Sequence, residues 1–415
     1  MVPISAKLAA RRSPVAPVLI RVSHAVAIIS LLFAGTGCST FPGVGESDES
    51  GRAILPPLEQ RPRQEPISRN FFMLESGQQS VVGEPQIVFT RADDTFSDLA
   101  REYGLGYDEL VAANPGLDPW LPGDNTAVLL PTQYVLPDTP LEGIVLNIAS
   151  KRLFYFHRDD EDLPLQVLTF PIGIGRVGWE TPLGDTTVVS KARDPAWYVP
   201  ASVRREHAEA GDPLPAVVKA GPDNPLGRFV LKLAMPGYLI HGTNQPYGVG
   251  MRVSHGCVRL YPENIELLYS LVGLGETVTI INEPFLAGWR DGELYFESHA
   301  PLEEDSLSAE QRLELLFESA RWQSGEPRQP HEQDHVRTIA SDPTGVAVRI
   351  LPGDAAEVYE RARLVRNTVE ADPEAPTLAE VRQLLDAPPS ESEEPAEAAT
   401  LLATGDEQSG QPDGE

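Results

Sequence analysis

The sequence predicts a mostly-β sandwich with few helices in the middle of the chain, a small α/β module before it and a disordered acidic tail after it. Short β-rich runs separated by Gly and Pro fill residues 141–284. Residues 86–136 have the pattern strand, helix, helix, strand. Residues 326–415 are acidic and are expected to be largely disordered, although Val346–Leu351 could form a strand and Ala355–Arg366 and Thr377–Leu385 could form helices. From Ala387 the chain is rich in Pro, Glu and Ser, a composition that favours disorder. At 415 residues the chain exceeds one ordinary domain, so we expect two or three units.

Residues 1–38 have the composition of an export signal. Basic residues as far as Arg21 precede an apolar run, Ala25 to Gly35, that is too short to span a membrane, and small residues lead to Cys38. This end resembles a bacterial lipobox, whose cysteine is diacylated and becomes the mature N-terminus; ordinary signal cleavage is the alternative. We therefore expect a periplasmic protein anchored to a membrane by a lipid on Cys38. By analogy with Gram-negative lipoproteins, Ser39 favours the outer membrane.

Two polar segments flank the predicted folded units. Residues 39–85 are rich in Gly, Ser, Pro and charge and predict a flexible tether with a reach of roughly 35–40 Å. Residues 301–415 hold 26 acidic and 9 basic residues, which accounts for −17 of the net charge of −28. The tail is then either a partner-binding appendage or, by default, a solvating segment beside an anionic envelope. Because no basic patch is present to displace phosphate counterions, nucleic acid is not an expected partner.

Residues 86–136 predict a small folded module. Asp94 or Thr95 can cap a helix whose apolar positions include Phe96 and Leu99. Together with Ala113-Asn-Pro115, the Asp94-Thr95 pair resembles a LysM module, a small peptidoglycan-binding fold. The alternative is a small α/β domain without affinity for glycan.

Residues 141–284 predict the sandwich itself. Its strands are expected at Ile144–Ile148, Leu153–Phe156, Leu165–Ile172, Thr186–Lys191, Phe229–Leu233 and Thr277–Ile281. One helix is expected to begin near Pro262, since Pro suits a first turn and Ile265 and Leu268 follow at helical spacing. Residues 285–325 predict a hairpin and a helix packed on this domain.

Cys257 is the candidate nucleophile. It lies in Ser254-His-Gly-Cys-Val-Arg259, sixteen residues after His241. A thiol with a pKa of about 8.5 needs a base or a cation to react at neutral pH. His241 follows an apolar strand that could lie beside the cysteine segment, and His255 would share a face with Cys257 if the segment were extended. Gly256 suits a tight turn in which backbone N–H groups converge on an oxyanion.

Other interpretations of these residues remain open at this point. Arg252 and Arg259 could supply positive charge to a thiolate or a substrate carboxylate, and Arg252 equally suits a structural ion pair. Tyr238 fits the core or a cleft wall as well as a substrate contact. His241, His255 and Cys257 could be zinc ligands, although no fourth ligand accompanies them, or Cys257 could be an inert buried thiol. A Cys38–Cys257 disulfide is disfavoured because Cys38 falls in the export signal.

The combined motifs resemble the YkuD-type L,D-transpeptidase family. The resemblance covers about residues 141–284 and is carried by His241-Gly-Thr-Asn244, Gly248-Val-Gly250 and Ser254-His-Gly-Cys-Val-Arg-Leu260. It implies that Cys257 is the nucleophile, that His241 activates it, and that His255, Gly256 and Cys257 supply backbone N–H groups to an oxyanion hole. The candidate substrate-binding residues are Ser254, Arg259, Gly242, Arg252 and Tyr238.

The function that this resemblance implies is acyl transfer on peptidoglycan without a metal or organic cofactor. The thiolate would attack the bond between diaminopimelate and the terminal D-Ala of a tetrapeptide stem, release D-Ala, and pass the acyl group from a thioester to an amine. The amine would be another stem, giving a 3→3 cross-link, or a lysine of a Braun-type lipoprotein, because the module order resembles the subgroup that attaches this lipoprotein. Hydrolysis or exchange with free D-amino acids is an alternative, and a peptidoglycan-binding scaffold with an inactive catalytic unit is another.

Overall fold

The computed structural model describes residues 57–67, 70–74, 79–158, 160, 163–324, 329–350 and 355–370. The predicted export signal, including Cys38 and Ser39, lies outside these residues. Within the described ranges, none of the helices has the length and apolar character needed to cross a membrane.

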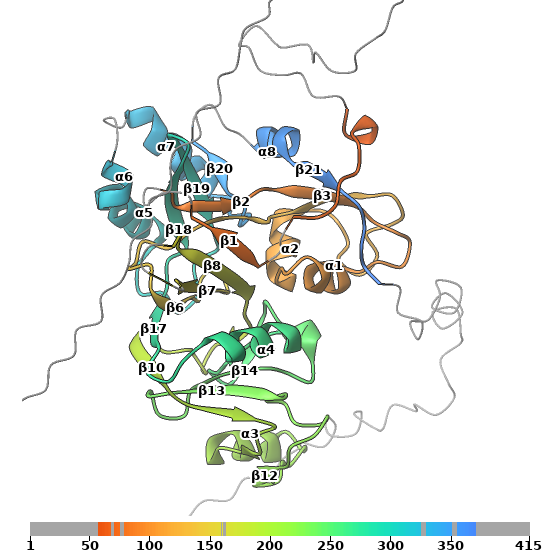
Figure 1. Cartoon of the computed structure of the whole chain (residues 1–415), viewed down its shortest axis with the longest axis vertical. Coiled ribbons are helices and arrows are strands. Elements are labelled where there is room, and N and C mark those ends of the chain that lie inside the picture. The colour runs from red at the N-terminus through yellow and green to blue at the C-terminus, as the bar shows by residue number, and fades with distance from the viewer. Residues whose placement is uncertain are drawn as a thin grey trace, which may run out of the picture. The chain divides into compact units, whose positions relative to one another are not determined.

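A nine-stranded sheet is built from strands between Phe71 and Ile281 (Figure 1). Its order is β1-β8-β7-β6-β17-β10-β13-β14-β16. The strands are β1 (Phe71–Met73), β6 (Gly143–Asn147), β7 (Arg152–His157), β8 (Gln166–Pro171), β10 (Gly184–Arg193), β13 (Phe229–Leu233), β14 (Leu239–His241), β16 (Val258–Arg259) and β17 (Thr277–Ile281). All six strands predicted for residues 141–284 are present in this sheet, so the prediction of a strand-rich domain is confirmed.

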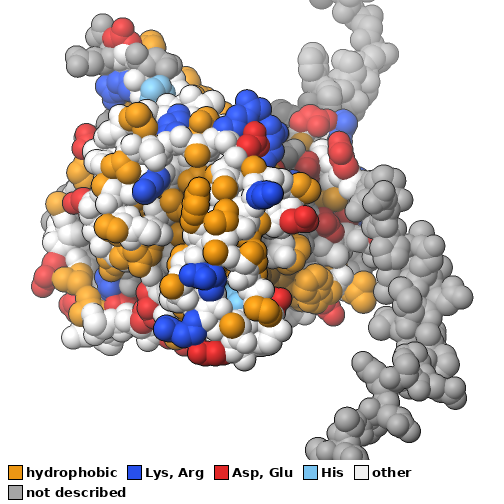
Figure 2. Space-filling view, turned by 90° about the horizontal axis from the view of Figure 1, so that it is seen from below, with side chains coloured by type: hydrophobic (Ala, Val, Ile, Leu, Met, Phe, Trp, Pro, Cys, Tyr) orange, Lys and Arg blue, Asp and Glu red, His pale blue; other side chains and the backbone are white. Residues whose placement is uncertain are grey.

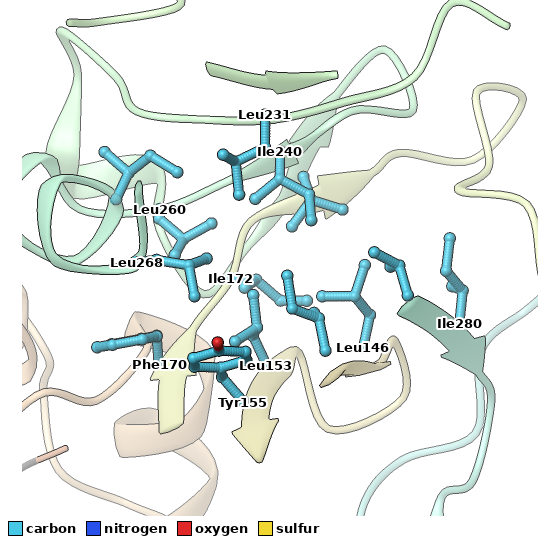
Figure 3. Close-up of a cluster of buried hydrophobic side chains, with 14 of the residues drawn as sticks. Leu146, Leu153, Tyr155, Phe170, Ile172, Leu231, Ile240, Leu260, Leu268 and Ile280 are labelled. Carbon is cyan, nitrogen blue, oxygen red and sulfur yellow. The ribbon is translucent and has the colours of Figure 1, made fainter. Parts of the chain in front are cut away.

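Strand β10 divides the sheet into two halves. Its first residues, Gly184–Thr187, pair with β17, and the remainder pairs with β13 across an irregularity between Val188 and Ser190. The inner faces of both halves contribute to one buried cluster. Figure 3 shows Leu231 and Ile240 on one side of this cluster and Leu146, Leu153 and Tyr155 on the other. The core therefore fills the space between two layers of strands.

Helix α4 (Pro262–Leu271) closes one end of this core. Pro262 occupies the first turn, as the sequence predicted, and Ile265 and Leu268 are buried in the cluster. The helix comes directly after β16, so it fixes the end of the strand that follows Cys257. The position of the predicted helix is thus confirmed.

Residues 86–130 form a βααβ module. It consists of β3 (Gln86–Phe89), α1 (Phe96–Glu102), α2 (Tyr107–Ala113) and β4 (Ala127–Leu130), and β3 pairs antiparallel with β4. Thr95 caps α1 in a capping box with Asp98. Buried Asn114 joins α2 to β4, because its amide donates to the carbonyl groups of Leu110 and Leu129. The predicted order of elements is confirmed.

The βααβ module is packed against the sheet. Alternate residues of β6 and β7 point to the two faces, and the outward-facing Val145, Phe154 and Phe156 share a cluster with Leu99 and other apolar residues of the module. Arg152 of β7 forms a buried ion pair with Glu109 of α2, 2.6 Å apart. This half of the sheet is therefore covered on both faces.

The predicted tether, residues 39–85, is ordered wherever it is described. Besides a 3-10 turn η1 (Leu58–Gln60), it contains β1 and β2 (Val81–Gly83), which pairs with β5 (Gln133–Val135). β1 adds to the sheet beside β8, and Phe72 contacts the ring of Tyr134 edge-on. The expectation of flexibility is wrong for these residues. Short apolar runs inside a polar segment gain stability from the strand edges to which they add.

Residues 285–350 form a further α/β unit. It contains β18 (Phe285–Arg290), β19 (Glu293–Ser298), β20 (Val348–Arg349), α5 (Ala309–Glu318), α6 (Ala320–Gln323) and α7 (Pro330–Ala340). β18 and β19 make a hairpin, and the three helices enclose a cluster that includes Phe317 and Trp322. The hairpin and helix expected for residues 285–325 thus lie in a unit that extends to residue 350.

The expectation of disorder from residue 326 is wrong for residues 329–350 and 355–370. Beyond α7 and β20, the chain forms α8 (Ala355–Arg361) and β21 (Arg363–Val365), which pairs parallel with β3. Val358 and Leu364 are buried against the βααβ module. The possible strand at Val346–Leu351 and the possible helix at Ala355–Arg366 are present in shorter form as β20 and α8. Residues 363–365, expected in that helix, instead form β21, because the edge of β3 is their partner. Residues 371–415 lie outside the described part.

Candidate active site

His241 and Cys257 lie at two neighbouring strands, on the same face of the sheet. β14 and β16 run parallel, with Ile240 opposite Val258 and His241 opposite Arg259. Ile240 and Val258 both point into the core, so His241 and Arg259 lie on the other face, and Cys257, just before β16, is placed on that face as well. Diagonal neighbours in a sheet have Cβ atoms up to about 8 Å apart, within reach of long or aromatic side chains.

His241 is held in the tautomer that a general base requires. Its ring is buried, and Nδ1 lies 2.6 Å from the carbonyl oxygen of Gly242. A carbonyl oxygen can only accept, so Nδ1 carries the proton and Nε2 has its lone pair available. Burial lowers the pKa of His241 to about 3, and the neighbouring charge of Arg259 acts in the same direction. At neutral pH the ring is therefore neutral and can accept a proton.

Cys257 is a partly exposed thiol. Its Sγ lies 3.7 Å from the carbonyl oxygen of Gly237. Desolvation raises the pKa of Cys257, whereas the backbone N–H of Leu239 and the charge of Arg259 oppose that rise. The thiol of Cys257 is therefore protonated at neutral pH, and the imidazole of His241 is neutral.

The turn before Cys257 is fixed by two hydroxyl groups. Gly256 has φ of +99°, and a Cβ there would lie 3.0 Å from Cε1 of Tyr238. Ser254 Oγ accepts from the N–H of Gly256 at 3.1 Å and donates to the carbonyl of Cys257 at 2.6 Å. Thr181 Oγ1 donates to the carbonyl of Gly256 at 3.0 Å and accepts from the N–H of Gly175.

These bonds determine which backbone groups can face a substrate. The carbonyl of Gly256 points to Thr181, so in a planar trans peptide the N–H of Cys257 points away from Thr181. The N–H of Gly256, expected in the oxyanion hole, instead donates to Ser254. Thr181 was not singled out from the sequence, although it begins the motif Thr181-Pro-Leu-Gly184 that contributed to the resemblance.

His255 is directed to a different element. Its Nε2 lies 3.0 Å from Glu206 Oε2 and 3.1 Å from a guanidinium nitrogen of Arg176, and Trp179 contacts its ring edge-on. Glu206 belongs to α3 (Ala201–Glu209). The expected sharing of a face with Cys257 is wrong, because the positive φ of Gly256 interrupts the extended backbone. His255 instead connects the turn before Cys257 to α3. Glu206 and Arg176 had no local sequence signal.

Helix α3 is part of an insertion, residues 194–228, between β10 and β13. Two short strands, β11 (Trp197–Tyr198) and β12 (Val217–Val218), pair beside it. Figure 2 shows the face seen from below Figure 1, the end at which α3 and β12 lie, where hydrophobic side chains gather among separate Lys and Arg side chains. The exposed basic residues of the insertion are Arg204, Arg205, Lys219 and Arg228.

The remaining candidate residues have three different surroundings. Tyr238 is half-buried and packs against the core and Gly256. Gly242 lies close to α4, where a Cβ would approach Ile265 to 3.0 Å. Arg252, in β15 (Arg252–Ser254), is paired with Glu304 at 2.6 Å and donates to the carbonyl of Gly175. The structure therefore favours the structural interpretation of Arg252.

No group of three His, Cys, Asp or Glu side chains is placed to hold a metal in the described part of the chain. His255 is hydrogen-bonded to Glu206, so the three residues considered as zinc ligands do not converge. The sulfur of Cys257, the imidazole of His241 and Arg259 remain as the candidate reactive groups of this face.

Comparison with known proteins agrees with this geometry. Residues 142–280 match YkuD, the L,D-transpeptidase catalytic domain. The chain is 43% identical over 226 residues to "Probable L,D-transpeptidase YbiS" of Escherichia coli K12, covering 54% of this chain and 72% of that protein. The chain belongs to the L,D-transpeptidase family. Members of this family are transferase-type enzymes, and the matched residues include both His241 and Cys257.

Two further proteins extend the comparison. "Probable L,D-transpeptidase YcfS" of Escherichia coli K12 is 39% identical over 261 residues, which cover 61% of this chain and 80% of that protein. The solved catalytic domain of the E. faecium L,D-transpeptidase matches with a TM-score of 0.26 and 21% identity, covering 35% of this chain and all of that one.

Proposed function

We propose that this chain is a peptidoglycan L,D-transpeptidase in which Cys257 is the nucleophile and His241 the base. The observation that carries the proposal is the tautomer of His241: its Nδ1 is hydrogen-bonded to Gly242, which leaves Nε2 as an acceptor on the face that also bears the sulfur. The donor is a tetrapeptide stem. The scissile bond joins the L-centre of diaminopimelate to the terminal D-Ala.

In the first half-reaction, the thiol of Cys257 loses its proton to Nε2 of His241 as the sulfur attacks the carbonyl carbon. The new C–S bond gives a tetrahedral oxyanion, which the N–H of Cys257 is oriented to stabilise. The C–N bond then breaks, and the proton on His241 passes to the departing amine of D-Ala. The product is a thioester on Cys257 and free D-Ala.

In the second half-reaction, an amine attacks the thioester. Nε2 of His241 takes a proton from the attacking nitrogen, the C–S bond breaks, and His241 returns that proton to the sulfur. A diaminopimelate amine gives a 3→3 cross-link, and a lysine amine of a Braun-type lipoprotein gives anchoring. Water or a free D-amino acid would give hydrolysis or exchange at the same site.

The regions outside the catalytic unit fit an enzyme that works at the cell wall. The βααβ module, as a LysM module, would bind glycan beside the catalytic unit. Lipidation of Cys38 would hold the protein in the periplasm at a membrane, the outer membrane by the analogy of Ser39. These parts of the proposal rest on the sequence resemblances.

The test is D-Ala release from a disaccharide tetrapeptide, followed by mass spectrometry of the muropeptide products. We expect release by the wild type and none above background by Cys257→Ala. The chain offers a matched control in its only other cysteine: Cys38→Ala should keep D-Ala release. The mass of the second product identifies the acceptor.

A second measurement separates the enzyme from an inactive scaffold. A carbapenem should add one covalent adduct to the wild type and to Cys38→Ala, and none to Cys257→Ala, in intact-protein mass spectrometry. A folded wild type that gives neither the adduct nor D-Ala would instead support a scaffold.

A further inference from the structure

Arg259 is a partly buried cation whose guanidinium has no protein partner among the described residues. Its Nε is buried and has no hydrogen-bond partner, and no carboxylate pairs with its guanidinium among the described residues. Two other arginines of this domain differ: Arg252 is paired with Glu304, and Arg152 with Glu109. Removing a charge from water without a compensating partner is costly. A bound anion would therefore supply the partner that this unpaired arginine lacks.

The position of Arg259 is fixed by its neighbours. Its backbone exchanges two hydrogen bonds with Gly173, at 2.8 and 2.9 Å, and on the other side it lies opposite His241. A Cβ at Gly248 would approach Nη1 of Arg259 to 3.1 Å, so Gly248 leaves room for the guanidinium. The charge of Arg259 acts on both Cys257 and His241.

The sulfur of Cys257 is two residues from Arg259 on the same face. Two steps along a strand amount to roughly 6.5 Å, a span that an extended arginine side chain can cover. When the residue after the scissile bond is the last of the donor peptide, its carboxylate carbon lies within about 4 Å of the scissile carbonyl carbon. A guanidinium can hold such a carboxylate through two parallel N–H···O bonds.

We propose that Arg259 binds the free carboxylate of the departing residue, so that the enzyme selects donors in which the scissile bond precedes the chain terminus. This inference rests on the proposed function. It assigns donor specificity to one side chain and leaves Arg252 outside the substrate site. Other carboxylates of a stem peptide lie more bonds away from the scissile carbonyl than this one does.

The test compares two donors that differ only in charge at the terminus: a tetrapeptide ending in D-Ala, and the same peptide ending in D-Ala amide. The kcat/KM for release of D-Ala or D-Ala amide is measured for the wild type, Arg259→Gln, Arg259→Lys and the matched control Arg252→Gln. We expect the wild type to favour the acid by about 10- to 100-fold, the range for a hydrogen bond to a charged group. Arg259→Gln should lose that preference because the acid rate falls to the amide rate.

The variants differ in what they retain. Arg259→Lys keeps the charge but loses the two-pronged geometry, so an intermediate preference is expected. Arg252→Gln should keep the wild-type preference. Alkylation of Cys257 by neutral iodoacetamide, together with circular dichroism, establishes that each variant is folded with an accessible thiol.

Three results would overturn the inference in distinguishable ways. If an active wild type uses the D-Ala and D-Ala amide donors equally well, the inference about Arg259 is wrong and the proposed function is unaffected. A loss in Arg259→Gln that is equal for both donors would mean that Arg259 acts on the thiol or imidazole. No release from either donor by the folded wild type would contradict the proposed function, and the inference with it.

Discussion

The junction between the βααβ module and the sheet differs from the active-site face in the partners that each gives to an arginine side chain. At the junction, the guanidinium of Arg152 is paired with Glu109, donates to Thr169 and Gly104, and lies over the ring of Tyr134. At the active site, Arg259 has none of these partners. The first arrangement joins two parts of the chain; the second keeps a charge available. The set of partners therefore separates the structural arginine from the arginine that we propose binds substrate.

The largest expected effect is at the junction. Glu109→Ala leaves Arg152 buried without its counter-ion, and we expect a loss of about 3–5 kcal/mol in the free energy of unfolding, measured by urea denaturation. The neighbouring ion pair of Lys151 with Asp108 is more exposed, so Asp108→Asn is the matched control and should cost less than about 1 kcal/mol. Equal effects of the two variants would remove the contrast between the two regions.

The second effect is the pH dependence that His241 imposes. Its pKa is lowered to about 3 in the folded protein, from 6.5, so below pH 6.5 the unfolded chain binds a proton that the folded chain does not. Above pH 6.5 the histidine is neutral in both states and does not lower the free energy of unfolding. As the pH falls from 6.5 towards 3, the free energy of unfolding decreases by about 1.4 kcal/mol per pH unit. Between pH 7 and pH 5, the wild type should lose about 2 kcal/mol more stability than His241→Gln. Parallel curves would contradict this.

The third effect concerns Thr181. Thr181→Val keeps the shape but removes the hydroxyl that holds the carbonyl of Gly256, so the N–H of Cys257 loses its fixed orientation. We expect kcat for D-Ala release to fall about tenfold, equivalent to one hydrogen bond of about 1.4 kcal/mol, with a smaller change in KM. Thr181→Ser, which retains the hydroxyl, should restore most of the rate. Unchanged kcat in Thr181→Val would show that the turn is held without it.

The smallest effect should be on the stability of the Arg259 variant. Arg259 has no carboxylate partner to leave unpaired, so Arg259→Gln should change the free energy of unfolding by less than about 1 kcal/mol, or increase it. Urea denaturation of this variant beside Glu109→Ala gives a direct comparison. A loss as large as that of Glu109→Ala would mean that Arg259 has a structural role.

The parts of the fold that were predicted correctly depend on local periodicity. Alternating apolar residues in β6, β7 and β8 divide cleanly between two clusters, and helical spacing after Pro262 placed α4. The wrong expectations concern segments that are stable only beside a particular partner. β1 and β21 are three residues each and add to edges formed by β8 and β3, which no local pattern of these segments could indicate.

The sequence by itself determined the chemistry available: a thiol in a glycine-containing turn, a histidine sixteen residues earlier, and two arginines nearby. Only the tertiary structure decided how these groups are used. It paired Arg252 with Glu304 and left Arg259 unpaired, fixed the proton of His241 through Gly242, and turned His255 to Glu206. The physical reason is that residue type fixes donors, acceptors and intrinsic pKa values, whereas burial and partners, which change those pKa values and consume those donors, arise from segments distant in the chain.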